Sequence, residues 1–441
     1  MPTTPALVTD LSAPSGPSGS RNSDSGSRLG WLDALRGIAA LAVVVDHLTY
    51  FTLIELKTTA FAYFYPGWFG VALFFLVSGY IIPASLERRG SLRRFWLSRI
   101  FRLYPIWAVA VGAICLLSAA GLISIGAYHT DHPVRTALGH LTMLQSLIEQ
   151  QPVMQLLWTL SFEMVFYLLV SALFVTGLHR RSGLWALTLI GATALLGFVV
   201  QPAAGTATAH HKTAFAVAGL FAIAIAGFLI GRRLTIAIGA VAAVALCVGL
   251  LSTSGLLGDW RNIGVLALMF TGTVLYRAER GQMPWPRAIA VTTIVGVLLA
   301  FMMALPAPRW FAVPRDEPRW SWLTATLLAV ALFSIGLKWR PSRVPGWLAW
   351  LGRISYSVYL LHSVLIFIML AIVGEPDKLP ILTQVGLAAV LISLLLALST
   401  LTYRFVEDPF QRWGSAFARR IETRFGSDAG VAPLLSGSRR N

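Results

Sequence analysis

Residues 31–50 read WLDALRGIAALAVVVDHLTY, an apolar stretch that contains four ionisable side chains. A helix needs about 20 mostly apolar residues to cross a hydrocarbon core of about 30 Å. Each charged group inside such a helix costs about 2.5–3.5 kcal/mol on insertion scales and usually serves a function. The stretch therefore predicts a membrane helix with functional polar residues, namely Asp33, Arg36, Asp46 and His47. Asp46 points about 100° away from His47, and its alternative is a paired or lumen-facing acid.

The composition of the whole chain is that of a membrane protein. Of its 441 residues, 56% are hydrophobic and 12% are charged, whereas soluble domains carry about 25% charged residues. The mean hydropathy is +0.71. We expect an all-α, polytopic integral membrane bundle of about 10–12 transmembrane helices. The expected spans lie near 32–50, 67–86, 104–124, 156–176, 184–201, 213–230, 234–252, 262–276, 287–305, 321–337, 355–373 and 381–402.

Lys and Arg are concentrated in alternate connections between these spans. The segments 87–102, 179–183, 231–233, 277–287 and 338–343 contain sixteen, whereas the longer opposite set contains eight. Cytoplasmic connections of membrane proteins carry such an excess, so we expect the first set and both termini to be cytoplasmic. This distribution of the net charge of +16 favours a lipid bilayer as partner and argues against nucleic acid. The high ratio of Arg to Lys hints at a bacterial plasma membrane protein.

The two ends of the chain differ from the spans in composition. Residues 1–29 are rich in Ser and Gly and predict a disordered cytoplasmic tail, residues 30–410 form the membrane domain, and residues 411–441 form a basic cytoplasmic tail. In that last tail Trp413, Phe417, Ile421 and Phe425 recur every four residues between arginines. This pattern fits a surface helix on anionic lipid or, equally, a partly ordered solvated segment.

The first span carries the best candidate for a catalytic base. Arg36 and His47 are eleven residues apart, so they share a helical face at a separation of roughly 16 Å along the axis. An imidazole is suited to removing a proton near neutral pH. Asp33 lies one turn from Arg36 and can pair with it. The structural alternatives are a charge pair at the helix end and a hydrogen-bonded packing histidine.

Two other places in the sequence supply charged candidates. Arg99 and Arg102 form an R-x-x-R pair whose guanidinium groups could bind phosphates of a cytosolic donor such as coenzyme A. Glu163 follows Trp158 and Ser161 at the start of the fourth span and needs a partner, for which Arg36 and His47 are candidates. Its alternative is an interior ion pair that holds helices in register.

The remaining candidates are weaker. Ser355, Tyr359 and His362 share a stripe of the eleventh span, which predicts either a cavity lining or interhelical hydrogen bonds. His129, His132 and His140 lack accompanying carboxylates, and Cys115 and Cys247 lie within apolar runs. We therefore expect no metal site and no permanently bound cofactor.

Six motifs in order resemble the membrane acyltransferase-3 family between about residues 31 and 410. They are Leu32-Asp33-Ala34-Leu35-Arg36-Gly37 with His47 (R-x10-H), Leu73–Tyr80, Arg99-x-x-Arg102-x-x-Pro105, Trp158–Glu163, Ile354–His362 and Glu407-Asp408-Pro409-Phe410. Some members carry a C-terminal esterase-like domain, and we expect none after residue 410. The expected lack of this domain favours a small or lipid-linked acceptor over a large glycan.

The resemblance implies transfer of an acyl group, often acetyl, from cytosolic acyl-CoA to a hydroxyl of a surface glycan, lipid-linked saccharide or macrolide-type molecule. It implies His47 as the catalytic histidine, Arg36 as its motif partner, and Arg99 and Arg102 as donor contacts. From its place in the fourth span we expect Glu163 to be catalytic as well. Further expected site residues are Ser78 and Tyr80 for the donor and Asp33, Trp158, Ser161, Tyr359 and His362 for the acceptor. The competing hypothesis is a proton-coupled small-molecule transporter, in which His47, Glu163 and Arg36 form a proton relay. The oligomeric state stays open.

Overall fold

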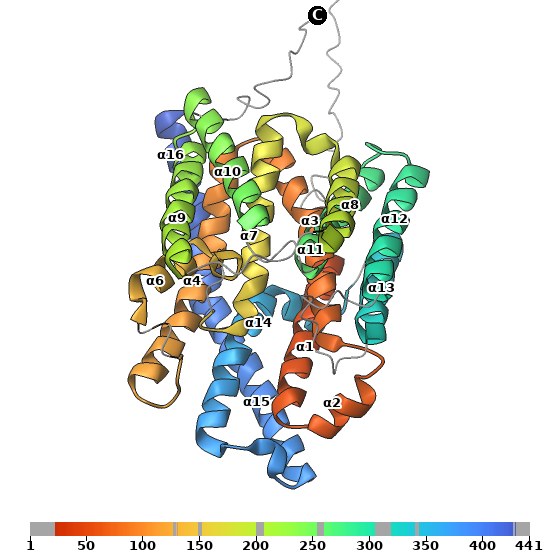
Figure 1. The fold of residues 1–441 in the computed structure, drawn as a ribbon, viewed down its shortest axis with the longest axis vertical. Helices are drawn as coiled ribbons and strands as arrows, with labels where there is room; N and C mark the ends of the chain where they lie inside the picture. Colours follow the sequence, from red (N-terminus) through yellow and green to blue (C-terminus); the bar gives the residue numbers. More distant parts are fainter. Residues whose placement is uncertain are drawn as a thin grey trace, which may run out of the picture.

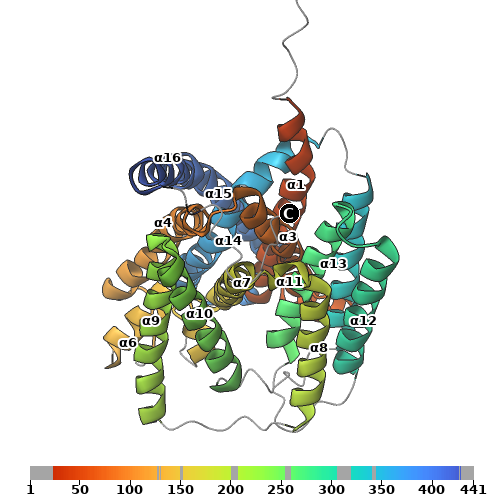
Figure 2. The same ribbon diagram turned by 90° about the horizontal axis from the view of Figure 1, so that it is seen from above.

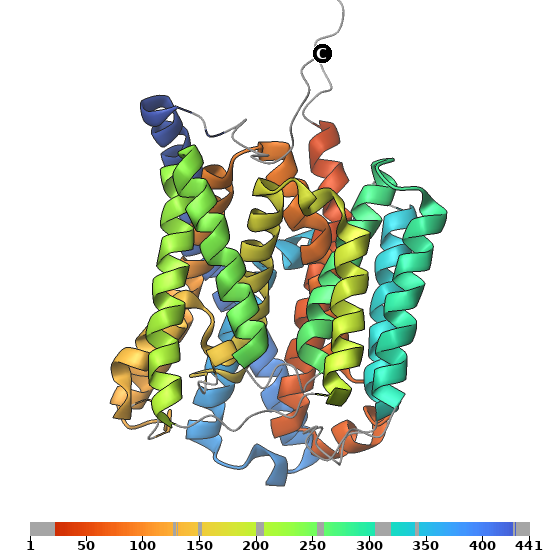
Figure 3. The same cartoon turned by 45° about the horizontal axis from the view of Figure 1, so that its top comes forward.

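The fold is a bundle of long helices. A computed structural model describes residues 23–126, 129, 131–148, 152–199, 207–253, 260–304, 319–339, 344–426 and 428, and these residues contain no β-strand. Figures 1 and 3 show the helices standing side by side. They are α1 (Ser23–Phe51), α2 (Ile54–Ala60), α3 (Pro66–Arg89), α4 (Leu92–Ala119), α6 (Pro133–Thr142), α7 (Trp158–Val175), α8 (Ser182–Val199), α9 (Ala207–Ile230), α10 (Arg233–Thr253), α11 (Trp260–Glu279), α12 (Trp285–Ala304), α13 (Arg319–Trp339), α14 (Gly346–Val373), α15 (Ile381–Thr402) and α16 (Asp408–Phe425).

Each of the twelve expected spans coincides with one of these helices. Four helices begin at least six residues before the expected span, namely α1 at Ser23, α4 at Leu92, α9 at Ala207 and α14 at Gly346. Ten of the described helices are long and apolar enough to cross a membrane, and α8 and α11 are outside that set. The protein is therefore a polytopic helical membrane protein.

The expected tail boundaries are shifted. α1 begins at Ser23, inside the segment 1–29 that was expected to be disordered, and residues 1–22 lie outside the described residues. At the other end α15 continues through a π-helical segment, Tyr403–Glu407, into α16, which ends at Phe425. Of the two possibilities for residues 411–425, the structure has the helix. Most of the segment after 426 lies outside the described residues.

Glycine residues bring α1 very close to its two neighbours. A Cβ atom at Gly352 of α14 would lie 2.0 Å from the carbonyl oxygen of Asp33, and one at Gly70 of α3 would lie 2.4 Å from that of Ala39. In the same way a Cβ atom at Gly79 of α3 would lie 1.8 Å from the carbonyl oxygen of Met269 in α11. Small residues permit such close approach between membrane helices. α14, α1, α3 and α11 therefore pack in series through close backbone contacts.

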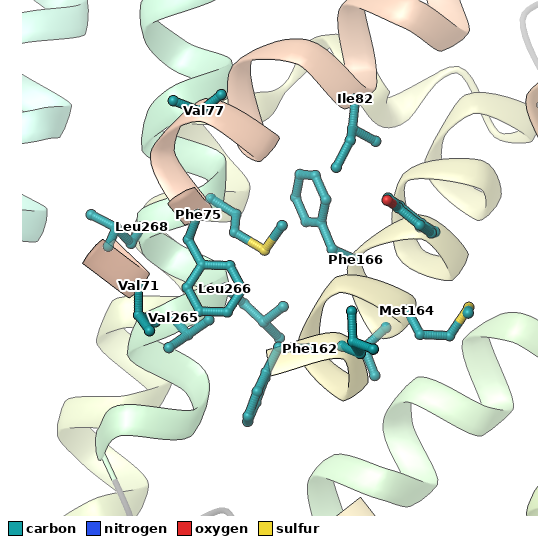
Figure 4. Packing of buried hydrophobic residues seen from close by; sticks show 14 of the residues in the cluster. Val71, Phe75, Val77, Ile82, Phe162, Met164, Phe166, Val265, Leu266 and Leu268 are labelled. Carbon is teal, nitrogen blue, oxygen red and sulfur yellow. The ribbon is translucent and has the colours of Figure 1, made fainter. Parts of the chain in front are cut away.

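Large apolar side chains fill the space between α3, α7 and α11 (Figure 4). Phe75, Phe162 and Phe166 are each at most 3% exposed, and the rings of Phe166 and Phe270 meet edge to face at 5.2 Å. Seen from above, α3, α7 and α11 lie inside the bundle, whereas α9, α12 and α16 lie at its edge (Figure 2). Side chains that project from α7 are therefore enclosed by protein.

Arg93 has a structural role inside the protein. It is 4% exposed, and its guanidinium donates to the carbonyl oxygens of Leu229 at 2.7 Å, Ile230 at 2.5 Å and Gly426 at 3.0 Å. The last carbonyl groups of a helix have no partner within that helix. Arg93 therefore caps the C-terminal end of α9 and ties it to the residue that follows α16.

Gly79→Ala is expected to destabilise the protein, because the new methyl group would collide with the backbone of α11. Overpacking of this kind costs about 1–3 kcal/mol, and the melting temperature in detergent should fall. The matched control is Gly112→Ala in α4, where an added Cβ meets nothing within 4 Å. Equal melting temperatures for the two variants would contradict the close approach of α3 and α11.

Candidate active site

His47 of α1 and His362 of α14 form a hydrogen-bonded pair. Nδ1 of His47 lies 3.0 Å from Nε2 of His362, and the two rings are stacked with centroids 5.1 Å apart. His362 is 1% exposed, and His47 is half-buried. The sequence singled out both residues, but for separate roles. The packing of α1 on α14 brings them together.

The hydrogen bonds indicate which nitrogen of His47 is free. Nδ1 of His362 lies 3.2 Å from the carbonyl oxygen of Val358, which can only accept a hydrogen bond. In the neutral pair His362 therefore carries its proton on Nδ1, and its Nε2 accepts the Nδ1–H of His47. Nε2 of His47 then carries no proton and keeps its lone pair, which is what a general base needs to accept a proton.

A small, largely apolar cavity of about 20 Å³ lies between α1, α3, α7 and α14, and neither histidine is among its lining residues. Its lining on α1 consists of Ala39, Ala40 and Val43, which occupy the turns between Arg36 and His47. The cavity thus extends from the level of Arg36 towards the level of the histidines. The other lining residues are Gly70, Val71, Phe74, Phe75, Thr159, Leu160, Glu163, Tyr356 and Tyr359.

Tyr359 and Phe74 border the cavity and connect its two ends. The Tyr359 hydroxyl lies 2.8 Å from Oγ1 of Thr159 and donates to the carbonyl oxygen of Leu156 at 3.0 Å. The ring of Phe74 stacks on Tyr359 at 6.4 Å, and the Arg36 guanidinium lies 5.5 Å from the centroid of Phe74. The sequence offered two roles for the stripe of Ser355, Tyr359 and His362, a cavity lining or interhelical hydrogen bonds. Tyr359 has both, because it lines the cavity and also makes interhelical hydrogen bonds.

Charged side chains gather at the Arg36 end of the cavity. This charged cluster comprises Asp33, Arg36, Arg99, Arg102, Glu163, Arg353 and Glu407, which interact electrostatically with one another. Asp33 interacts with Arg36, as expected, and also with Arg102 and Arg353. Four guanidinium groups face three carboxylates, so the fully ionised cluster has an excess positive charge. Such a cluster suits an anionic ligand.

Glu163 and Arg99 form the buried side of the charged cluster. Glu163 is 9% exposed and accepts a hydrogen bond from the Tyr167 hydroxyl at 2.5 Å. The Arg99 guanidinium is stacked near the rings of Phe95 at 5.2 Å and Tyr167 at 5.3 Å. The hydrogen-bond partner of Glu163 is Tyr167, and Glu163 also interacts electrostatically with Arg36 and Arg99. Arg99 is 6% exposed and Arg102 is half-buried, so Arg102 is the more accessible of the pair.

Four of the predicted residues lie outside this group. Trp158 packs edge to face on Phe75 and Phe162 at 6.3 and 5.8 Å. Ser161 is fully buried, and its hydroxyl has no hydrogen-bond partner in the described part of the chain. Ser78 is 9% exposed and does not line the cavity. Tyr80 donates to Glu279 and packs against Trp31, so its expected contact with the donor has no support from its position.

Glu407 and Tyr167 belong to the site although sequence reasoning gave neither of them a role. Glu407 is 3% exposed and accepts hydrogen bonds from Ser357 at 3.0 Å and Gln411 at 3.2 Å. It ends the π-helical segment between α15 and α16, and π-helical bulges are frequent at functional sites. The Glu407-Asp408-Pro409-Phe410 motif was the available signal. No spacing rule could relate it to Arg36, because the two lie at opposite ends of the chain.

The histidines between α4 and α7 are part of a local packing arrangement. His129 and His140 meet edge to face at 6.2 Å, and Nε2 of His140 accepts the backbone N–H of Val153 at 3.1 Å. Burial lowers the pKa of His140. Among the residues that the structure describes, no three His, Cys, Asp or Glu side chains are grouped as metal ligands.

The chain is similar in sequence to proteins named as acyltransferases. The family model described as an acyltransferase domain (acyltransferase-3) matches residues 29–403. A Bacillus subtilis (strain 168) protein named "Putative peptidoglycan O-acetyltransferase YrhL" is 22% identical over 426 residues, which cover 88% of this chain and 56% of that protein. "Putative acetyltransferase ORF330" of Acidianus two-tailed virus is 27% identical over 148 residues, 34% of this chain and 40% of that protein.

A third relative, from Staphylococcus aureus (strain COL), is named "Putative O-acetyltransferase" and is 29% identical over 162 residues, 33% of this chain and 24% of its own length. The chain thus spans about half or less of the length of each of these relatives. No solved structure matches it. Because the family model covers the bundle from α1 to the end of α15, the protein belongs to the acyltransferase-3 family of membrane proteins.

Proposed function

We propose that the protein is a membrane O-acyltransferase that moves a short acyl group from acyl-CoA to a hydroxyl of a sugar-containing acceptor, with His47 as general base. One observation carries the proposal. The stripe of α1 that begins with Arg36 in the charged cluster ends at the His47–His362 pair, and the turns between them line one cavity. Such a stripe can hold the phosphates of the donor at one end and its thioester towards the other.

The donor enters from the arginine-rich cytoplasmic face in this proposal. Arg102 and Arg36 are half-buried, and Arg353 is exposed, so their guanidinium groups can bind the phosphates of coenzyme A. Arg99 lies deeper, beside Glu163, and keeps that end of the cavity positively charged. The apolar lining between the two ends suits the pantetheine arm.

The histidine pair then supports an acyl transfer in which His47 returns to its starting state. Nε2 of His47 takes the proton of the acceptor hydroxyl as the oxygen attacks the thioester carbonyl. The tetrahedral intermediate collapses, the C–S bond breaks, and the coenzyme A thiolate takes the proton back from His47. His362 accepts from Nδ1–H of His47 and stabilises the imidazolium that forms in between.

The acetyl group and a sugar hydroxyl are the donor group and acceptor we favour, because one relative is named as a peptidoglycan O-acetyltransferase. The test is to incubate the purified protein with labelled acetyl-CoA and hydroxyl acceptors, including peptidoglycan fragments and lipid-linked sugars. Acetyl-CoA-dependent labelling of an acceptor supports the enzyme. A proton-coupled transporter would leave both molecules chemically unchanged.

His47→Ala is expected to lower kcat by at least about 10²–10⁴-fold, the usual contribution of a general base. His362→Ala should cause a smaller loss of kcat with little change in the donor KM. The substitution removes the hydrogen bond that fixes the tautomer of His47, but it leaves His47 itself in place. His132→Ala, on the loop before α6, is the matched control and should retain activity. An active His47→Ala protein would disprove the mechanism.

Arg102→Gln is expected to raise the KM for acyl-CoA. A hydrogen bond to a charged group contributes about 1.5–3 kcal/mol, so the KM should rise roughly 10- to 150-fold while kcat changes less. Arg88→Gln removes an exposed arginine from the end of α3 and serves as the control for charge alone. Steady-state kinetics with varied acyl-CoA measures both, and equal KM values in the two variants would exclude Arg102 from the donor site.

A further inference from the structure

The helix α16 has an inner face that is tightly docked on α4. Gly414 and Ala418 are its buried residues, and a Cβ atom at Gly414 would lie 2.5 Å from the side chain of Phe101. The rings of Phe101 and Phe417 lie 6.1 Å apart, and Arg94 forms an ion pair with Glu422. Gly414 has no side chain of its own between the α16 backbone and Phe101. A displacement of α16 therefore also displaces Phe101 and α4.

An exposed flank of α16 carries aromatic side chains followed by arginines, and Phe417 lies where this flank borders the docked face. Trp413 and Phe417 are 61% and 47% exposed, and Arg420 and Arg424 are exposed as well. Their spacing of four, three and four residues places them on one stripe of the helix. In the described part of the chain, Arg420 and Arg424 have no carboxylate partner, whereas Arg412 is paired with Asp408 at 2.7 Å. The stripe therefore presents two uncompensated charges.

The order of these side chains matches the layers of a bilayer leaflet. α16 continues the spanning helix α15 through the π-helical segment, so residues early in α16 lie nearer the hydrocarbon and later ones nearer the water. Arg424 lies roughly 16 Å beyond Trp413 along the axis. Aromatic rings favour the membrane interface, and arginines bind lipid phosphates just outside it. α16 lies at the edge of the bundle (Figure 2), and all four side chains of the stripe are exposed.

We infer that the stripe Trp413, Phe417, Arg420 and Arg424 binds the headgroup of an anionic phospholipid in the arginine-rich leaflet, and that the bound lipid braces the donor site. Phe101, the residue on which α16 rests, stands between Arg99 and Arg102 in α4. Glu407, at the start of α16, interacts electrostatically with Arg102 and Arg36. The lipid thus fixes the helix that positions these arginines. The bracing of the donor site rests on the proposed function; the lipid site does not.

The test places the full-length protein in nanodiscs of phosphatidylcholine with and without phosphatidylglycerol. Mass spectrometry measures the ratio of the two lipids that stay bound, and kinetics measures the KM for acetyl-CoA. The variant is Arg420→Gln with Arg424→Gln. The matched control is Arg232→Gln with Arg233→Gln, which removes two exposed arginines from the turn between α9 and α10.

The wild type and the control are expected to retain phosphatidylglycerol preferentially and to show a several-fold lower KM when it is present. Each arginine near the surface contributes about 1 kcal/mol, so the variant should lose up to ~30-fold in its preference. Its KM should no longer respond to phosphatidylglycerol. Free inorganic phosphate should not restore the lower KM in phosphatidylcholine discs.

Each of three results would overturn a different part of the inference. Equal phosphatidylglycerol retention by the variant and the control excludes the lipid site. A lost preference with a KM that still falls when phosphatidylglycerol is added excludes the bracing of the donor site. If no protein in any disc uses acetyl-CoA, the proposed function and the bracing fail together, and the retention ratio still decides the lipid site.

Discussion

The close contact between α1 and α14 at Gly352 is the constraint on which the site depends. Charged side chains are costly inside a membrane span unless protein encloses and pairs them. Gly352 lets the backbone of α14 rest against Asp33, and Gly70 does the same for α3 against Ala39. With α1 enclosed on two sides, its polar stripe can face a cavity inside the protein instead of lipid.

Two kinds of polar group occupy opposite ends of α1 inside the bundle. At one end the charged cluster has more guanidinium groups than carboxylates, and at the other end two histidines share a hydrogen bond. Buried ions are tolerated when partners surround them, and an unmatched one favours a ligand of opposite charge. In the proposed reaction, this separation keeps the anionic phosphates of the donor away from His47. It also explains why the polar residues of the site come from several helices, with apolar side chains between them.

The C-terminal helix adds a connection between this interior and the membrane surface. The π-helical segment turns Glu407 inward, while the residues just before it, Arg404 and Phe405, are exposed. The same helix then docks on α4 through Gly414. A single rigid element therefore contacts both the charged cluster and the lipid-facing edge of the bundle. Such an element is well suited to relay the state of the bilayer to the site.

The sequence by itself determined the helical membrane fold, the positions of its long helices and the candidate residues Arg36, His47 and Glu163, because apolar runs and buried charges are properties of local sequence. It also placed Arg36 and His47 on one face, since the helical repeat is fixed. The tertiary structure decided the rest. It paired His47 with His362, gave Arg93 a capping role, and brought Glu407 to the arginines. These partners lie far apart in the chain, and only the packing of α1, α4, α14 and α16 sets their distances.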